Sequence, residues 1–108
     1  MFNGNLRNDN LIDNLPYGAC VEVPVIASKT GIQPLHVGNL PDQLAVLVNT
    51  SARCEELAVQ GLIERNRRKI FHAILFDPLT SAVLSMQEIQ DMVDEMFEAN
   101  KDYLKGFS

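Results

Sequence analysis

The feature that most constrains the fold of this chain is a change in hydrophobic periodicity near residue 40. Before that point, short β-branched apolar runs are separated by Asn, Gly and Pro, which is typical of strands joined by turns. After it, apolar residues recur at intervals of three and four, which indicates amphipathic helices. Strands followed by helices, without alternation, favour the α+β class. The whole length of 108 residues fits a single domain.

Turn and capping signals give the expected element boundaries. Short antiparallel strands are expected at residues 2–6, 19–27 and 32–37. Helices are expected at residues 41–65, 67–76, 79–84 and 86–101. A turn ending at Gly31 predicts a hairpin, and Pro24, which lacks an N–H donor, indicates an edge strand or a bulge. Ser85 and Glu88 match a capping box at the start of the last helix.

The long helix expected at residues 41–65 carries apolar side chains on more than one face. These residues are Leu44, Leu47, Val48, Ala52, Leu57, Val59, Leu62 and Ile63. A helix of this kind is expected to pack between layers or at a subunit interface. Gly61 lowers helix propensity slightly and permits close packing against a neighbour.

Charge and composition exclude some classes of partner. The net charge is −5, and the one basic cluster, residues 65–69, lacks interleaved aromatic residues, so a nucleic-acid partner is not expected. No apolar run is long enough to cross a bilayer, so no membrane partner is expected either. The first residues show no secretory leader pattern. We therefore expect a cytoplasmic protein.

Known catalytic motifs are not found among these residues. The sequence has no glycine-rich phosphate loop and no nucleophile elbow. Cys20 and Cys54 form no metal-binding pattern and are expected to be buried, reduced thiols. His72 is expected to be a partly buried structural residue on a helix. His36, which precedes a glycine, is expected on a loop surface, where it could contact a neighbouring chain.

The Asn- and Asp-rich segment near the N-terminus is the one loop with the composition of a binding site. Amides and carboxylates on a loop suit hydroxyl-rich ligands, but turn formation explains the same residues. The candidate residues for a cleft or interface loop are Arg7, Asn8, Asn10, Asn14 and His36. From the residues alone, the chain is a soluble α+β domain with no visible active site.

Several segments follow one another in a recognisable order. Residues 7–16 read Arg-Asn-Asp-Asn-Leu-Ile-Asp-Asn-Leu-Pro, and residues 21–24 read Val-Glu-Val-Pro. The order continues with residues 31–34, 36–41, 77–84 and 98–102. Together they resemble the C-terminal region of glycoside hydrolase family 4. Their residues are most similar to those of the α-galactosidase (melibiase) branch, which has α-galacturonidases and 6-phospho-α-glucosidases as relatives. Asn10 stands where the family loop usually has Gly. Asn is the next best residue at positive φ, so the turn is expected to form.

The resemblance implies a lactate dehydrogenase-like enzyme with an N-terminal nucleotide-binding domain. In that family NAD transiently oxidises the sugar at C3, elimination follows, and Mn²⁺ polarises the sugar oxygens. The family's NAD loop, metal-binding Cys and His, and catalytic Asp and Tyr lie upstream of these motifs. Cys20 and His36 do not stand in those contexts, so we assign no catalytic, cofactor or metal residue here.

The expected role is therefore that of a C-terminal domain or fragment that is inactive alone. It would pack against the nucleotide-binding domain, close one side of the sugar cleft and support a homo-oligomer. Two alternatives stay open: a separately encoded subunit, and a sugar-binding or self-assembling module without enzymatic activity.

Overall fold

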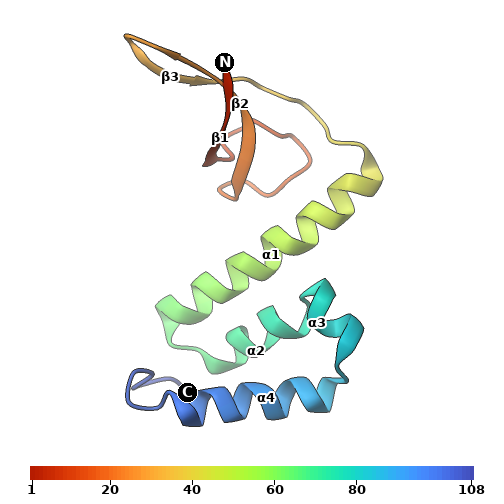
Figure 1. The fold of residues 1–108 in the computed structure, drawn as a ribbon, viewed down its shortest axis with the longest axis vertical. Helices are drawn as coiled ribbons and strands as arrows, with labels where there is room; N and C mark the ends of the chain where they lie inside the picture. The colour runs from red at the N-terminus through yellow and green to blue at the C-terminus, as the bar shows by residue number, and fades with distance from the viewer. The chain divides into compact units, whose positions relative to one another are not determined.

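The structure, a computed structural model, describes all of residues 1–108 and consists of three strands followed by four helices (Figure 1). The elements are β1 (Phe2–Arg7), β2 (Cys20–Ser28), β3 (Gly31–Pro34), α1 (Asp42–Glu64), α2 (Arg67–Leu75), α3 (Pro78–Val83) and α4 (Met86–Ala99). The α+β class is confirmed. The structure divides into two compact units, Met1–Ala52 and Arg53–Ser108, and α1 begins in the first and ends in the second. The single domain expected from length stays a prediction.

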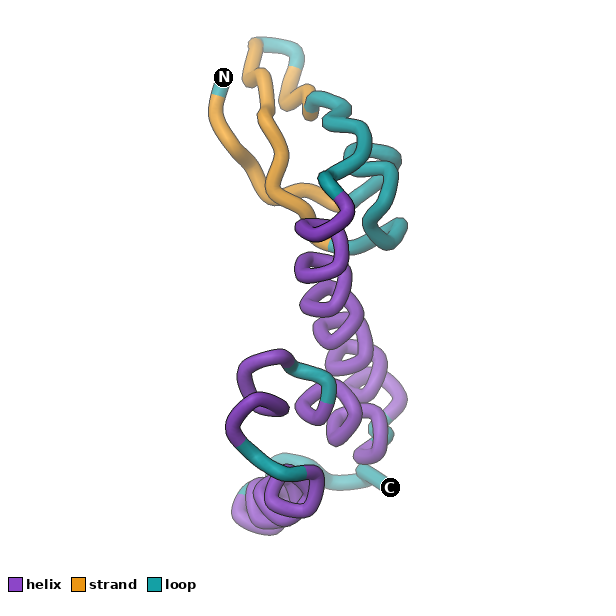
Figure 2. Tube along the Cα trace, turned by 90° about the vertical axis from the view of Figure 1, so that its right-hand side faces the viewer, coloured by secondary structure: helices purple, strands orange, loops and turns teal.

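The first unit contains one antiparallel sheet with the strand order β1-β2-β3. β2 and β3 form the expected hairpin, with Gly31 at a φ of 123° in its turn. Figure 2 shows the loops of this unit on one side of the strands. That side carries the core, because the buried Val21, Val23 and Val25 alternate along β2 and all point toward it.

The apolar residues that cover this sheet face come from the loop after β1. Leu11, Ile12 and Leu15 are buried against the β2 valines, with Leu6 and Leu40 partly buried beside them. The core of the first unit is therefore made by a strand and an irregular loop.

Two expectations for β2 are wrong. Cys20 is exposed, because it lies on the opposite side of β2 from the alternating valines. Pro24 lies in the central strand and not at an edge. The Pro24 carbonyl accepts from the N–H of Leu35, which follows the last residue of β3. The ring nitrogen of Pro24, which has no hydrogen to donate, is therefore on the side of β3 and at the end of that strand. The sheet loses one hydrogen bond at its margin, and β3 stops at Pro34 instead of reaching residue 37.

The second unit is held together by helix packing and by side-chain caps. Gly61 of α1 is buried, and a Cβ added there would lie 2.7 Å from Ile70 Cδ1 and 3.1 Å from the Ile70 backbone nitrogen. The absence of a side chain therefore allows α1 and α2 to approach closely, as expected. On α4, Ile89 and Val93 are buried, whereas Met96 is exposed.

Each of the last three helices begins with a side chain that accepts a backbone N–H. The residues at these N-caps are Asn66, Asp77 and Ser85. The Ser85–Glu88 capping box is confirmed, with the Ser85 N–H donating to the Glu88 carboxylate at 2.8 Å. Such caps satisfy the free donors at helix starts, which explains why three short helices follow one another here.

Candidate functional site

Asn8 organises the loop that follows β1. Its side chain is 1% exposed, and its Oδ1 accepts from the N–H groups of Leu11 (3.0 Å) and Ile12 (2.9 Å). Its Nδ2 donates to three carbonyls, those of Ile12, Leu15 and Pro16, at 3.0–3.3 Å. All its polar atoms are engaged within the loop, so Asn8 shapes this loop and offers nothing to a ligand.

Asn10 and Asn14 also shape the loop, in different ways. Asn10 has a φ of 58°, so the turn expected at this residue forms with Asn at a positive φ. Asn14 bonds the segment before α1, since its Nδ2 donates to the Leu40 carbonyl (2.8 Å) and its Oδ1 accepts from the Leu40 N–H (2.9 Å). The loop is therefore fixed at both its tip and its end.

His36 is brought to this loop by the fold. Its Nε2 lies 2.8 Å from Asp13 Oδ1, and the two side chains are 59% and 47% exposed. Backbone bonds from Val37 to Leu11 and from Asp13 to Gly38 align the two segments. His36 thus lies on a loop surface as expected, and its ring contacts Asp13, a partner that the sequence did not indicate.

Arg7 lies at the other end of the loop, with its guanidinium 5.2 Å from the centre of the exposed Tyr17 ring. The outward-facing members of the candidate set are therefore Arg7, Asn10 and His36. They give the loop two basic groups and an amide at the surface, which suit hydrogen bonding to a polar ligand or to a neighbouring protein segment.

The side chains of this chain do not assemble a metal site by themselves. No group of three His, Cys, Asp or Glu residues lies close enough to hold a metal ion. Cys20 and Cys54 are both free. Burial raises the pKa of the Cys54 thiol, and the carboxylates of Asp77 and Glu55 raise it further, so this sulfur is not a ready metal ligand or nucleophile.

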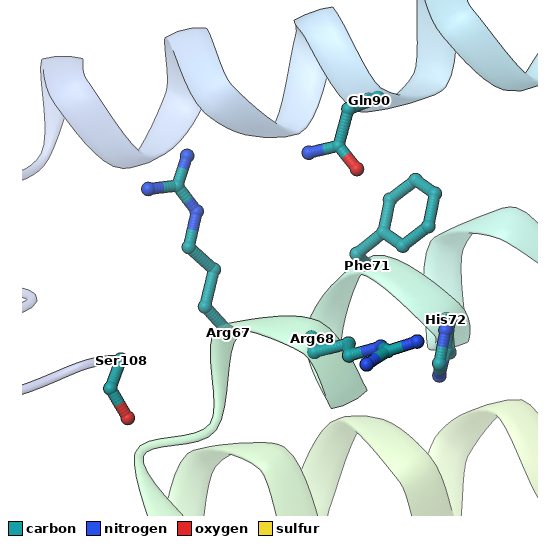
Figure 3. Close-up of a pocket in the computed structure, with 6 residues that line it drawn as sticks. All are labelled: Arg67, Arg68, Phe71, His72, Gln90 and Ser108. Carbon is teal, nitrogen blue, oxygen red and sulfur yellow. The ribbon is translucent and has the colours of Figure 1, made fainter.

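A basic and aromatic hollow of about 420 Å³ lies in the second unit (Figure 3). It is lined by Arg67, Arg68, Phe71, His72, Gln90 and Ser108. Arg67 points toward α4, where it pairs with Asp94 and lies over the Phe97 ring. Arg68 extends toward His72 instead. Sequence reasoning missed this hollow, although the i,i+4 spacing of Arg68 and His72 places them on one helix face.

His72 is half-buried on α2, as expected, and its ring lies 5.6 Å from the Phe71 ring and 6.2 Å from the Phe76 ring. A second hollow of about 180 Å³ is lined by apolar side chains and by one amide residue, Asn100. It is formed by Ile70, Ile74, Met92, Val93, Met96, Phe97, Asn100 and Leu104. Ser108 and His72 both line the basic and aromatic hollow, but they lie at opposite ends of it (Figure 3). No ionisable side chain lines the second hollow.

Seven large apolar side chains of α1 are exposed to solvent. In the first unit Leu44, Val46, Leu47 and Val48 are exposed. In the second unit Val59, Leu62 and Ile63 are exposed, with spacings of three and four that place them on one helix face. None of the four helices combines the length and the hydropathy that a membrane-spanning helix needs.

The fold and the surface define an α+β domain with a tightly braced loop and exposed apolar helix faces. The family 4 glycosyl hydrolase C-terminal domain matches residues 1–80, and the chain belongs to this family.

Relatives in this family are much longer than the chain. An α-galactosidase of Bacillus subtilis is 40% identical over 106 residues, which are 98% of this chain and 24% of the relative. Among solved structures, a 6-phospho-α-glucosidase from gut microorganisms in complex with NAD and glucose 6-phosphate has a TM-score of 0.80 and 29% identity. The match covers 94% of this chain and 24% of that one.

A second such structure, in complex with NAD and Mn²⁺, has a TM-score of 0.82 and 25% identity, and the match covers 93% of this chain and 22% of that one. These relatives have the dehydrogenase-like family fold, and the chain spans about a quarter of their length. The side chains of this chain form no cluster that could hold a metal ion, so they do not by themselves fit the Mn²⁺ of that relative.

Proposed function

We propose that this chain acts as the C-terminal domain of an NAD- and Mn²⁺-dependent glycosidase of the α-galactosidase type. In this role it packs against the nucleotide-binding domain, closes one side of the sugar cleft and contributes to a subunit interface. The cofactor and the metal belong to the remainder of the enzyme, so the chain alone hydrolyses no glycoside. The sequence similarity to the Bacillus α-galactosidase supports the choice of sugar.

The uncovered apolar face of α1 carries this proposal. Val59, Leu62 and Ile63 are 54%, 57% and 78% exposed. Covering a large aliphatic side chain that is about half exposed stabilises by roughly 1 kcal/mol. An isolated protein gains nothing from such residues, whereas a domain buried against the rest of an enzyme gains from each of them.

The braced loop supports the cleft-closing part of the proposal. Asn8 and Asn14 hold the loop rigid, while Arg7, Asn10 and His36 face outward. A rigid loop that presents polar groups is suited to one wall of a site for a hydroxyl-rich ligand. The two free thiols agree with a reducing compartment, and we propose a cytoplasmic location.

A chimera tests the proposal. The segment of the Bacillus α-galactosidase that matches this chain is replaced by residues 1–108, and hydrolysis of nitrophenyl α-galactoside is followed with NAD, Mn²⁺ and reductant. We expect turnover by the chimera and none by the isolated chain. A matched variant, Leu62→Asp with Ile63→Asp, places two charges on the uncovered face and should abolish the activity of the chimera.

The outcomes separate the parts of the proposal. An inactive but folded chimera would contradict the assignment to α-galactosidase-type enzymes. Full activity of the Asp variant would show that α1 is not the surface that packs on the enzyme. Turnover by the isolated chain that requires NAD would place a complete active site within these residues.

A further inference from the structure

The hydrogen-bond pattern of the sheet shows which backbone groups of β1 lack a partner. The N–H of Asn8 donates to the Ala19 carbonyl (2.7 Å), and these residues are opposite each other in the β1–β2 register. Because bonded and non-bonded pairs alternate in an antiparallel ladder, the even-numbered residues of β1 bond to β2. The N–H and C=O groups of Asn3, Asn5 and Arg7 therefore point away from β2.

This outer edge has none of the features that usually prevent strand addition. β1 has six residues, no proline and a single charged residue, Arg7, at its end. The opposite edge of the sheet is different, since β3 has four residues and ends at Pro34. β1 is therefore the edge open to a further strand (Figure 1).

The apolar face next to this edge is also incomplete. Phe2 and Leu6 point to the same side as the buried valines of β2, since they lie opposite Val25 and Val21. Leu6 is partly buried by the core, whereas Phe2 remains 50% exposed. An additional strand with an apolar residue near Phe2 would extend the core across it.

We infer that the free edge of β1 is a strand-docking site. In the whole enzyme its occupant is an extended segment from the part of the family fold that lies outside these residues. The inference rests on the proposed function. About three quarters of the similar 6-phospho-α-glucosidase chains lie outside the match, so a strand is available from the same enzyme. The docked strand has apolar side chains at alternate positions, on the side of Phe2 and Leu6.

A second copy of β1 is the competing occupant of this edge. A two-fold pairing centred on Gly4 uses the outward groups of Asn3 and Asn5 and places Phe2 of one copy opposite Leu6 of the other. A strand from the same enzyme is the assigned occupant because the chain spans only about a quarter of its relatives' length. A dimer of the isolated chain is the alternative outcome of the tests.

Amide hydrogen exchange on the isolated chain and on the unmodified chimera tests the inference. In the isolated chain, the amides of Asn3 and Asn5 should exchange rapidly, while those of Gly4 and Leu6 are protected by β2. In the chimera the Asn3 and Asn5 amides should slow by on the order of 100-fold, and Gly4 and Leu6 should remain protected.

Proline substitution gives a second, independent measurement. Asn5→Pro removes an outward N–H and no bond to β2, so the isolated chain should keep its thermal midpoint. The same substitution should lower the midpoint of the chimera, and the matched Asn5→Ala should not. Equal midpoints for the two chimeric variants would overturn the inference.

The exchange readout separates this inference from the proposed function. Unprotected Asn3 and Asn5 amides in an active chimera overturn the docking site and leave the proposed function intact. Protected amides in an inactive chimera support the docking site while the proposed function fails. A dimer of the isolated chain that protects Asn3 and Asn5 and dissociates on Asn5→Pro would mean that a second copy is the occupant, and would overturn the assignment.

Discussion

Removal of the Asn8 side chain should unfold the first unit. Asn8→Ala leaves the buried N–H groups of Leu11 and Ile12 without an acceptor and removes the donor to three carbonyls. Each buried donor left unsatisfied costs about 1–3 kcal/mol, so the loss for the two donors is about 2–6 kcal/mol. A compact unit of this size is typically stable by only about 3–8 kcal/mol. The loss is therefore comparable with the whole stability of residues 1–52.

Amide exchange at Val21, Val23 and Val25 gives the direct measurement, because these valines form the centre of the first unit. We expect their protection to fall in Asn8→Ala in proportion to the lost free energy, together with a lower midpoint in urea. Amides of α4 should be less affected, since Asn8 makes no bond to that unit.

Two further variants separate hydrogen bonding from composition. Asn5→Ala removes an exposed amide of the same type on β1 and should change stability by less than about 0.5 kcal/mol. Asn8→Asp retains the shape and the acceptor but places an oxygen against three carbonyls, so it should also destabilise. If Asn8→Ala lowered the free energy of unfolding by less than about 1 kcal/mol, the five bonds would not be holding the loop, and the reasoning would be refuted.

Three other changes have defined outcomes in the second unit. Gly61→Ala should destabilise by up to about 2 kcal/mol in urea unfolding, because overpacking against Ile70 costs about 1–3 kcal/mol and helix propensity returns about 1. Asp77 accepts hydrogen bonds from the backbone N–H and the hydroxyl of Thr80, and these bonds lower the pKa of its carboxyl group. Because the pKa of Asp77 is lower in the folded chain than in the unfolded chain, its carboxylate stabilises the fold at pH values above its ordinary pKa, near 4. This stabilisation is lost as the pH falls, so the helical circular dichroism signal of the native chain should decrease below about pH 4. The decrease should be smaller in Asp77→Ala. Ser85→Ala should cost about 1 kcal/mol. It should raise the pKa of Glu88 only part of the way to its ordinary value, because the backbone N–H of residue 85, the larger cause of the lowered pKa, is kept and only the side-chain bond is lost; a carboxyl titration by NMR would measure this.

Local patterns predicted the elements of this chain well because they depend on neighbours only a few residues away. The strand and helix types and the capping box follow from periodicity and from backbone donors that lie within one turn. The positive φ of Asn10 follows from the few residue types that tolerate it. The motifs in sequence order also identified the family, which the match over residues 1–80 confirms.

The candidate site could be predicted only in part. Composition singled out the Asn-rich loop, but it could not separate the buried Asn8 from the exposed Asn10. His36 meets Asp13 across 23 residues, and Asn14 meets Leu40 across 26. Contacts at such separations depend on the path of the chain, and no local pattern encodes them.

The sequence by itself therefore determined which segments are strands and helices, where the helices begin, and to which family the chain belongs. Only the tertiary structure decided that Pro24 lies in the central strand, that Cys20 is exposed, and that the edge of β1 is free. The physical reason is that propensity and capping act between residues close in sequence. Strand order, the burial of a polar side chain and the direction of an unpaired N–H depend on which distant segments meet.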